Sequence, residues 1–219
     1  MKTKLNFMGY IKYIVNQVRK PRGFFGKKIA RRMNISHAPL AEWGISHLTL
    51  RKDMIILDVG CGGGANITYF AQNVIDGHVF GIDYSPISVK VSKEVNKKYI
   101  EKGIVEIRES SVSNLPFEDN TFDLVSGFEA YYFWPDLIND LKEIYRVLKI
   151  SGELILVNEG YKCENKEVLK SIEKWANQGD FKLYSPEEYK DFLKRGGFSD
   201  IRIFEQKENG WITAIAKKM

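Results

Sequence analysis

The sequence has few cysteines, few histidines and no long apolar segment. Its two cysteines, Cys61 and Cys163, and its three histidines show no metal-ligand spacing, so we predict no metal site. No apolar run approaches the length that a membrane-spanning helix needs. The N-terminus also lacks the continuous apolar segment of a secretory signal. We therefore expect a cytoplasmic protein with reduced thiols and without a membrane span.

Acidic residues are scarce only at one end of the chain. Residues 1–52 contain 12 lysines and arginines but one acidic residue, Glu42, whereas the remainder has a net charge of −6 and the whole chain one of +5. Such asymmetry indicates either an anionic partner or a solvated helical face against an acidic core. The length of 219 residues suits one domain with additions.

The basic N-terminal segment has helical periodicity. Its apolar stripe consists of Phe7, Ile11, Ile14 and Val18. A second helix is expected over about 26–33 and a third reaching about Leu50. We predict that residues 1–50 form a helical cap or lid over a domain of residues 51–219. A helix lying on a membrane surface is the alternative, because either target would bury the same apolar face.

From residue 51 onward, strand-like and helix-like segments alternate, which predicts a parallel sheet with helices around it. The expected strands are 54–59, 78–83, 105–108, 122–128 and 153–158, and the expected helices are 65–72, 86–102, 135–148 and 165–177. A helix opening at Ser185-Pro186 and ending at Gly196-Gly197 follows. The short link 207–210 then predicts an antiparallel hairpin of 201–206 and 211–216.

A glycine-rich bend follows the first expected strand. It reads Gly60-Cys61-Gly62-Gly63-Gly64 and opens a helix-like segment. Glycine permits positive φ and close approach of a ligand, and a helix N-terminus offers free amides. Asp83 ends the next strand, where a carboxylate can accept hydrogen bonds from two ribose hydroxyls. The arrangement indicates a cofactor that contains adenosine.

Two cofactors compete for this bend. Gly60, Gly62 and Ala65 fit the dinucleotide pattern G-x-G-x-x-G/A, which would make the chain a nicotinamide-dependent oxidoreductase. Asp58, however, lies inside the strand, where a buried carboxylate needs a partner. S-Adenosylmethionine brings a sulfonium and an amino group to that place, whereas a pyrophosphate would be repelled. The residues therefore favour S-adenosylmethionine, with a non-catalytic cofactor-binding module as a further alternative.

Four segments in the correct order resemble class I S-adenosylmethionine-dependent methyltransferases, within the ubiquinone/menaquinone-type, small-molecule-like branch. They are 58–64, 81–85, 114–125 and 143–153, and the resemblance covers roughly 50–160. It implies an α/β fold of the Rossmann-like methyltransferase type. That fold has a mostly parallel seven-stranded sheet, helices on both faces and a C-terminal antiparallel hairpin, here beneath the helical N-terminal cap.

The resemblance also implies a set of cofactor-binding residues. They are Asp58, Gly60, Cys61, Gly62, Gly64, Asp83, Tyr84, Ser111, Val112 and Phe128. In the family, the position of Tyr84 often packs on adenine. Ser111 departs from the pattern, because it stands where the family usually has an acidic residue; its hydroxyl accepts a hydrogen bond without the strength of a charge. Cys61 is interpreted as a small filler rather than a nucleophile.

The loop after the fourth strand, 128–135, carries four consecutive aromatic residues at the place where substrates bind in such sheets. We predict that Tyr131, Tyr132 and Trp134 line the acceptor pocket, with packing under the cap as the alternative. His37 and Glu129 are the candidates for a catalytic base or substrate anchor.

The leading functional hypothesis is methyl transfer to a small molecule by in-line displacement, with S-adenosylhomocysteine as the product. Methylation of RNA or protein, with the basic N-terminal segment as an anchor, is a less favoured alternative.

Overall fold

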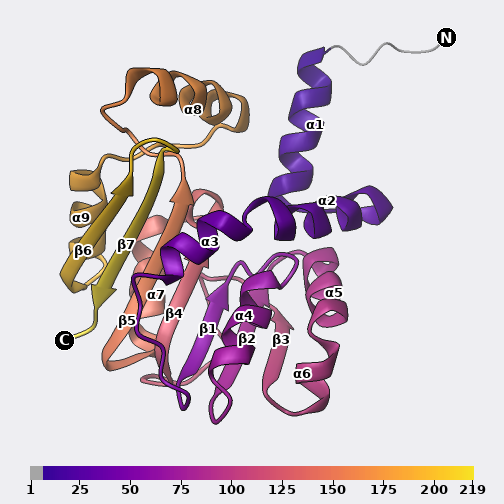
Figure 1. Cartoon of the computed structure of the whole chain (residues 1–219), viewed down its shortest axis with the longest axis vertical. Coiled ribbons are helices and arrows are strands. Elements are labelled where there is room, and N and C mark those ends of the chain that lie inside the picture. The colour runs from indigo at the N-terminus through magenta and orange to yellow at the C-terminus, as the bar shows by residue number, and fades with distance from the viewer. Residues whose placement is uncertain (1–6) are drawn as a thin grey trace.

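The computed structural model describes residues 7–219, with side chains from residue 13 onward. One seven-stranded sheet has the order β3-β2-β1-β4-β5-β7-β6 (Figure 1). Its strands are β1 (Ile55–Val59), β2 (His78–Asp83), β3 (Val105–Glu109), β4 (Phe122–Phe128), β5 (Leu148–Glu159), β6 (Ser199–Gln206) and β7 (Trp211–Lys217). The first five strands run parallel, whereas β7 is antiparallel to both β5 and β6. The predicted fold is confirmed.

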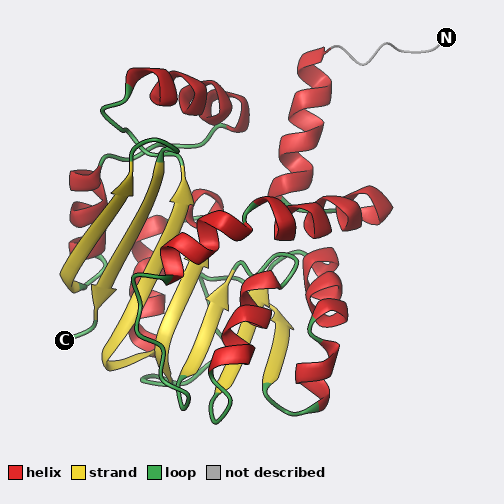
Figure 2. Ribbon diagram, in the orientation of Figure 1, coloured by secondary structure: helices red, strands yellow, loops and turns green. Residues whose placement is uncertain are grey.

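Helices cover both faces of this sheet (Figure 2). They are α1 (Phe7–Arg19), α2 (Gly23–Ser36), α3 (Ala38–Ile45), α4 (Ala65–Asn73), α5 (Pro86–Val95), α6 (Lys97–Glu101), α7 (Leu137–Val147), α8 (Lys166–Gly179), α9 (Pro186–Arg195) and the short 3₁₀ helix η1 (Tyr131–Phe133). One core cluster packs α7 and α9 against the sheet, and the other packs α3, α4 and α5 against it. No helix within the described residues has both the length and the apolar character that crossing a membrane requires.

Capping residues fix where several helices begin. The Ser85 hydroxyl accepts a hydrogen bond from the Ser88 amide, and Pro86 occupies the first position of α5, where no amide is needed. Ser185 and Glu188 form a capping box at the start of α9. These starts lie where the sequence predicts them, because capping depends on residues only three positions apart.

The single helix predicted over 86–102 is wrong. It breaks at Asn96 into α5 and α6, and Val95, the last residue of α5, is 40% exposed. The Asn96 side chain is fully buried, and its amide group donates hydrogen bonds to the carbonyl oxygens of Gly64 and Ser92. Asn96 therefore ties the end of α5 to the start of α4.

Two other predicted boundaries need correction. The third helix ends at Ile45 rather than near Leu50, and β5 begins at Leu148 rather than at 153. The early start of β5 reflects pairing with distant segments: Leu148 pairs with Phe122 of β4, the Ser151 amide donates to the Lys218 carbonyl, and the Lys218 amide donates to the Gly152 carbonyl. That pairing joins residues far apart in sequence, so local periodicity does not reveal it.

The N-terminal helices differ in how they meet the sheet. Whereas α1 projects away from the sheet, α2 lies across the ends of the strands beside α5 (Figure 1). Lys27 and Arg31 of α2 form ion pairs of 2.7 and 2.9 Å with Glu94 of α5. In contrast, α3 belongs to the core, with Leu40 and Ile45 both buried. The segment formed by α1 and α2 is called the cap below.

Candidate active site

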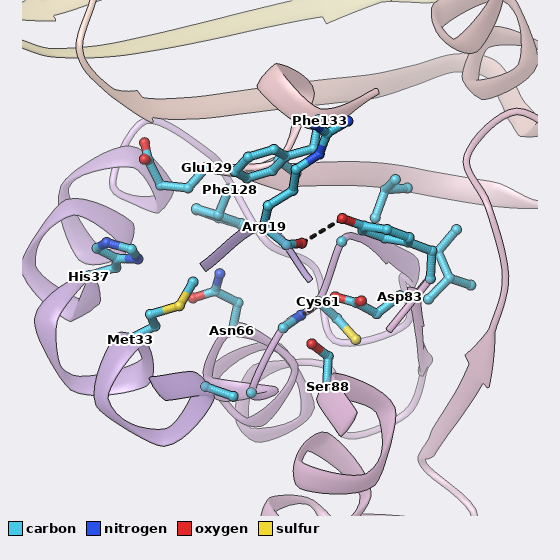
Figure 3. Close-up of a pocket in the computed structure, with 18 of the residues that line it drawn as sticks. Arg19, Met33, His37, Cys61, Asn66, Asp83, Ser88, Phe128, Glu129 and Phe133 are labelled. Carbon is cyan, nitrogen blue, oxygen red and sulfur yellow. Dashed lines mark hydrogen bonds between the residues drawn. The ribbon is translucent and has the colours of Figure 1, made fainter. Parts of the chain in front are cut away.

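A cavity of about 340 Å³ lies beneath the cap at the carboxyl ends of β1, β2 and β4. Its floor comes from the glycine-rich bend and from the residues that end β2, and its roof from the cap. In Figure 3, Cys61 and Asp83 lie on one side, and Met33, His37 and Glu129 on the other. Ligands of open α/β sheets bind at this edge.

The glycine-rich bend is held against the end of β2. Both the Gly60 and the Cys61 amides donate to the Ile82 carbonyl at 2.9 Å. Gly60, Gly62 and Gly64 have φ values of +76°, +51° and +82°, which favour glycine. A Cβ on Gly62 would meet nothing within 4 Å, so the backbone there is open to a ligand.

Gly64 has a different role from the other glycines of the bend. A Cβ there would lie 2.3 Å from the Ser92 hydroxyl oxygen, and the residue does not line the cavity. Gly64 thus permits α4 to approach α5. Cys61 does line the cavity, but burial raises the pKa of its thiol well above the usual value, so it remains a protonated, small filler there.

Asp83 lies at the cavity edge of β2 and is 7% exposed. Its Oδ2 accepts a hydrogen bond from the Gly62 amide at 2.9 Å, and its Oδ1 accepts one from the Ser85 amide at 2.8 Å. Burial raises its pKa, and these two amides oppose that shift. Each oxygen keeps a second lone pair, so the carboxylate has the capacity for two ribose hydroxyls.

Asp58 lies in β1 behind the bend and does not line the cavity. It is 1% exposed. Its Oδ1 accepts a hydrogen bond of 2.8 Å from the Ser126 hydroxyl, and its Oδ2 has no partner among the described residues. Burial raises its pKa to about 7. A buried carboxylate oxygen without a donor fits a cationic ligand on the other side of the bend.

The third part of the cavity is formed by Tyr84, Ser111 and Val112. The Tyr84 hydroxyl donates to the Arg19 carbonyl at 2.6 Å, the dashed line in Figure 3. Its ring therefore lies between the floor of the cavity and the cap. The Ser111 hydroxyl accepts a hydrogen bond from the Ser113 amide. Together with Phe128, these predicted residues surround one cavity.

Several cap residues complete the cavity, and the sequence did not identify them. They are Val18, Arg19, Pro21, Ala30, Met33 and Asn34. The Asn34 side-chain amide donates to the Gly63 carbonyl at 2.9 Å, and a Cβ on Gly63 would lie 2.3 Å from the Asn34 Oδ1 atom. The one signal in the sequence was Gly63 itself, a glycine of the bend that the cofactor motif does not require.

His37 and Glu129 come together from different segments. His37 joins α2 to α3, and Glu129 follows β4; both line the cavity. Burial lowers the pKa of His37, which keeps its imidazole neutral at pH 7. Glu129 has a φ of +51° and accepts a hydrogen bond from the Glu159 amide through Oε1. Removal from water raises its pKa to about 8.

The aromatic loop is divided between several environments. Trp134 lines the cavity, and its role in an acceptor pocket stays a prediction. Tyr131 does not: it is 3% exposed, and its hydroxyl accepts a hydrogen bond from the Tyr189 hydroxyl within the core. The prediction for Tyr131 is corrected, because the loop turns into η1 and directs this ring toward α9. Phe133, which was not singled out, lines the cavity beneath Arg19.

Tyr132 lines a second cavity of about 230 Å³, which extends toward α8. Its hydroxyl donates to the carbonyl oxygens of Glu159 and Gly160. The second cavity adjoins the first, since five residues line both: Val18, Met33, His37, Glu129 and Phe133. Among the described residues, no group of three His, Cys, Asp or Glu side chains is placed to hold a metal ion.

Comparison with known proteins agrees with this geometry. Residues 57–156 match the family model described as a methyltransferase domain. The sterol 4-C-methyltransferase of Caenorhabditis elegans is 29% identical over 69% of this chain and 45% of its own length. The demethylmenaquinone methyltransferase of Listeria welshimeri is 34% identical over 51% of this chain and 47% of its own length. The chain thus spans less than half the length of these relatives.

A solved structure shares the fold over nearly its whole length. The SAM-dependent methyltransferase from Aquifex aeolicus has a TM-score of 0.71 and 22% identity, covering 88% of this chain and 98% of that one. The matched segment 57–156 holds Asp58, the glycine-rich bend and Asp83, the residues whose geometry fits S-adenosylmethionine. Residues 57–156 therefore match a methyltransferase domain, and the chain shares the fold of that solved structure.

Proposed function

We propose that the protein transfers a methyl group from S-adenosylmethionine to a small-molecule acceptor. The observation that carries this proposal is the pair of adjoining cavities. The first has the features of a nucleoside site, and the second meets it at His37, Glu129 and Phe133. An acceptor in the second cavity would present its reacting atom at that junction.

Different residues of the first cavity would bind different parts of the cofactor. When bound, S-adenosylmethionine supplies a methyl group on a positively charged sulfur, which needs no further activation. Asp83 would hold the ribose, Tyr84 and Val112 the adenine, and the bend the methionine portion. The negative charge of Asp58 would balance the cation through the bend. Held in this way, donor and acceptor gain from orientation, which supplies up to about 7–11 kcal/mol in favourable cases.

His37 and Glu129 are the proposed groups for handling a proton of the acceptor. His37 is neutral at pH 7 and retains a lone pair for a proton. Glu129 has one carboxylate oxygen engaged by the Glu159 amide, and its Oε2 has no hydrogen-bond partner among the described residues. Glu129 is thus fixed at one oxygen and available at the other.

A small acceptor is favoured over RNA or protein. The second cavity is enclosed by residues of α1, α2, η1 and α8, which leaves a compact space. Lys27 and Arg31 are two of the basic side chains that could bind an anionic polymer. Both instead form ion pairs with Glu94 of the same chain. The two relatives described above also carry the names of enzymes that methylate small molecules.

The test is a titration followed by a transfer assay. Calorimetry should show that S-adenosylhomocysteine binds and that NADH does not. Incubation with methyl-labelled S-adenosylmethionine and a panel of small amines, phenols and carbon acids should then label at least one acceptor. Preferential binding of NADH would overturn the proposal. Tight binding of S-adenosylhomocysteine without transfer to any class of acceptor would favour a non-catalytic module.

Asp58 gives the cofactor site an expected pH dependence. Its pKa of about 7 means that raising the pH from 6 to 8 converts most of the carboxyl groups to carboxylates. Because the carboxylate attracts the cationic cofactor, affinity for S-adenosylmethionine should rise by about tenfold over this range. Calorimetry at both pH values measures the change. Asp58→Asn should flatten the profile, and an equally steep profile in this variant would contradict the role of Asp58.

A further inference from the structure

The second cavity has aromatic walls. Tyr132 and Phe133 come from η1, Trp175 from α8 and Phe181 from the loop after it. The Trp175 and Phe181 rings are stacked, with centroids 6.0 Å apart and planes at 15°, and the Phe133 ring meets Phe181 edge-on at 5.2 Å. Such walls offer ring faces to an apolar body and also to a cation.

The charges around this cavity have one sign. Two glutamates line it, Glu129 and Glu159, and no lysine or arginine side chain does so among the described residues. The charge of Glu159 acts on His37, whose pKa it raises against the larger effect of burial. Both acidic groups are therefore close to the junction of the two cavities.

The backbone holds Glu129 in an unusual conformation. Its φ of +51° lies in the left-handed region, which strains a non-glycine residue. The Glu129 amide donates to the Val157 carbonyl at 3.0 Å, and the carboxylate accepts from the Glu159 amide, so two contacts with the end of β5 keep it in place. The result is a carboxylate fixed at the junction with Oε2 facing no described donor.

The basic residue that lines the first cavity does not line the second. Arg19 lines the first cavity and not the second. Its guanidinium lies over the Phe133 ring, 5.9 Å from the centroid. Since Phe133 lines both cavities, its ring stands between the Arg19 charge and the second cavity. Among the described residues, Arg19 forms no ion pair with Glu129 or Glu159.

We propose that the second cavity selects an acceptor that carries an amine next to an apolar or aromatic body. This inference rests on the proposed methyl transfer and names its acceptor class. The amine would enter as an ammonium ion between the glutamates and the aromatic faces. One proton then passes to Glu129, the freed nitrogen lone pair bonds to the methyl carbon, and the electrons of the carbon–sulfur bond remain on sulfur.

The chemistry of the cavity disfavours the other acceptor classes. A carboxylate or phosphate would meet two acidic side chains and no lysine or arginine among the described lining residues, which is unfavourable. A neutral alcohol or carbon acid would fill the apolar part but leave the glutamates without a donor. An ammonium ion satisfies both halves of the cavity at once. Burial raises the pKa of Glu129 to about 8, and a bound ammonium ion favours the ionised form of Glu129, which accepts the proton.

Binding of probe molecules tests the proposal without turnover. The protein saturated with S-adenosylhomocysteine is titrated with benzyltrimethylammonium, with its neutral carbon isostere neopentylbenzene, and with phenylacetate. We expect the cation to bind at least about tenfold more tightly than the neutral isostere, and phenylacetate not to bind. Equal or tighter binding of the isostere, tightest binding of phenylacetate, or no binding of the cation would each overturn the inference.

Charge-neutral variants locate the effect. Glu129→Gln keeps an oxygen for the Glu159 amide, so the fold should persist, and it should lower the affinity for the cation by about tenfold without changing that for the isostere. Glu164→Gln is the matched control, because Glu164 is exposed, pairs with Lys207 and does not line the cavity. Unchanged cation affinity in Glu129→Gln would contradict the proposal.

The transfer assay separates this inference from the proposed function. Methylation of a phenol or a carbon acid, with no amine labelled, would overturn the amine assignment and leave methyl transfer intact. Failure to bind S-adenosylhomocysteine would overturn the proposed function itself. Labelling of arylalkylamines, reduced in Glu129→Gln and unchanged in Glu164→Gln, would support both.

Discussion

Asp83→Ala is expected to lower the affinity for S-adenosylhomocysteine by about 100-fold, or about 3 kcal/mol. The substitution removes the acceptor for two ribose hydroxyls. It also releases the Gly62 amide, which now donates to the carboxylate, and so loosens the bend on the methionine side. Calorimetric titration of the variant with S-adenosylhomocysteine measures the loss.

A matched control for this result is Asp76→Ala. Asp76 is an exposed acidic residue in the turn before β2, so the variant changes the net charge equally without touching the cavity. Asp83→Asn should lie between the wild type and Asp83→Ala, because it keeps one oxygen but loses the charge that strengthens each hydrogen bond. If Asp83→Ala bound S-adenosylhomocysteine as tightly as the wild type does, Asp83 could not be the residue that binds the ribose.

Deletion of residues 1–33 is expected to reduce turnover by at least about 100-fold while the remainder still unfolds cooperatively. The deletion removes five residues that line the first cavity, which opens the cofactor to water and frees its orientation. The sheet, with α3 and both core clusters, retains its packing residues. Transfer of labelled methyl groups and urea unfolding followed by circular dichroism measure the two effects.

Loosening the cap should have a smaller effect than removing it. Lys27→Ala combined with Arg31→Ala breaks both ion pairs to Glu94, which are partly exposed and contribute modestly. Turnover should fall less than tenfold in this variant. If the deletion abolished cooperative unfolding to the same extent as turnover, residues 1–33 would have to be regarded as part of the core.

The sequence predicts the cofactor floor well because its determinants are local. A strand, a glycine-rich bend and a helix occupy one short stretch, and Asp83 follows at the end of the next strand. Positive φ at Gly60 and Gly62 is a property that only glycine supplies without strain, so the residue type itself reports the conformation. The parallel pairing of the first five strands follows similarly from the alternation of strands and helices.

The acceptor side could not be predicted in the same way. It is assembled from the cap, from η1 and from α8, which are separated by long stretches of chain. Nothing in the loop distinguishes Tyr131, which packs on Tyr189, from Trp134, which faces the first cavity. For the same reason, the sequence does not predict that Trp175 and Phe181 line the second cavity. Only the contacts among distant segments decide which aromatic ring faces a cavity.

The hydrogen bonds between the cap and the end of β2 bear on how fast the proposed methyl transfer can repeat. Tyr84 and Ser85 each donate a hydroxyl to a cap carbonyl, that of Arg19 at 2.6 Å and that of Pro21 at 3.0 Å. A nucleoside in the cavity lies below these two bonds. We therefore expect the segment Lys20–Arg22, which joins α1 to α2, to affect the rate at which S-adenosylhomocysteine is released.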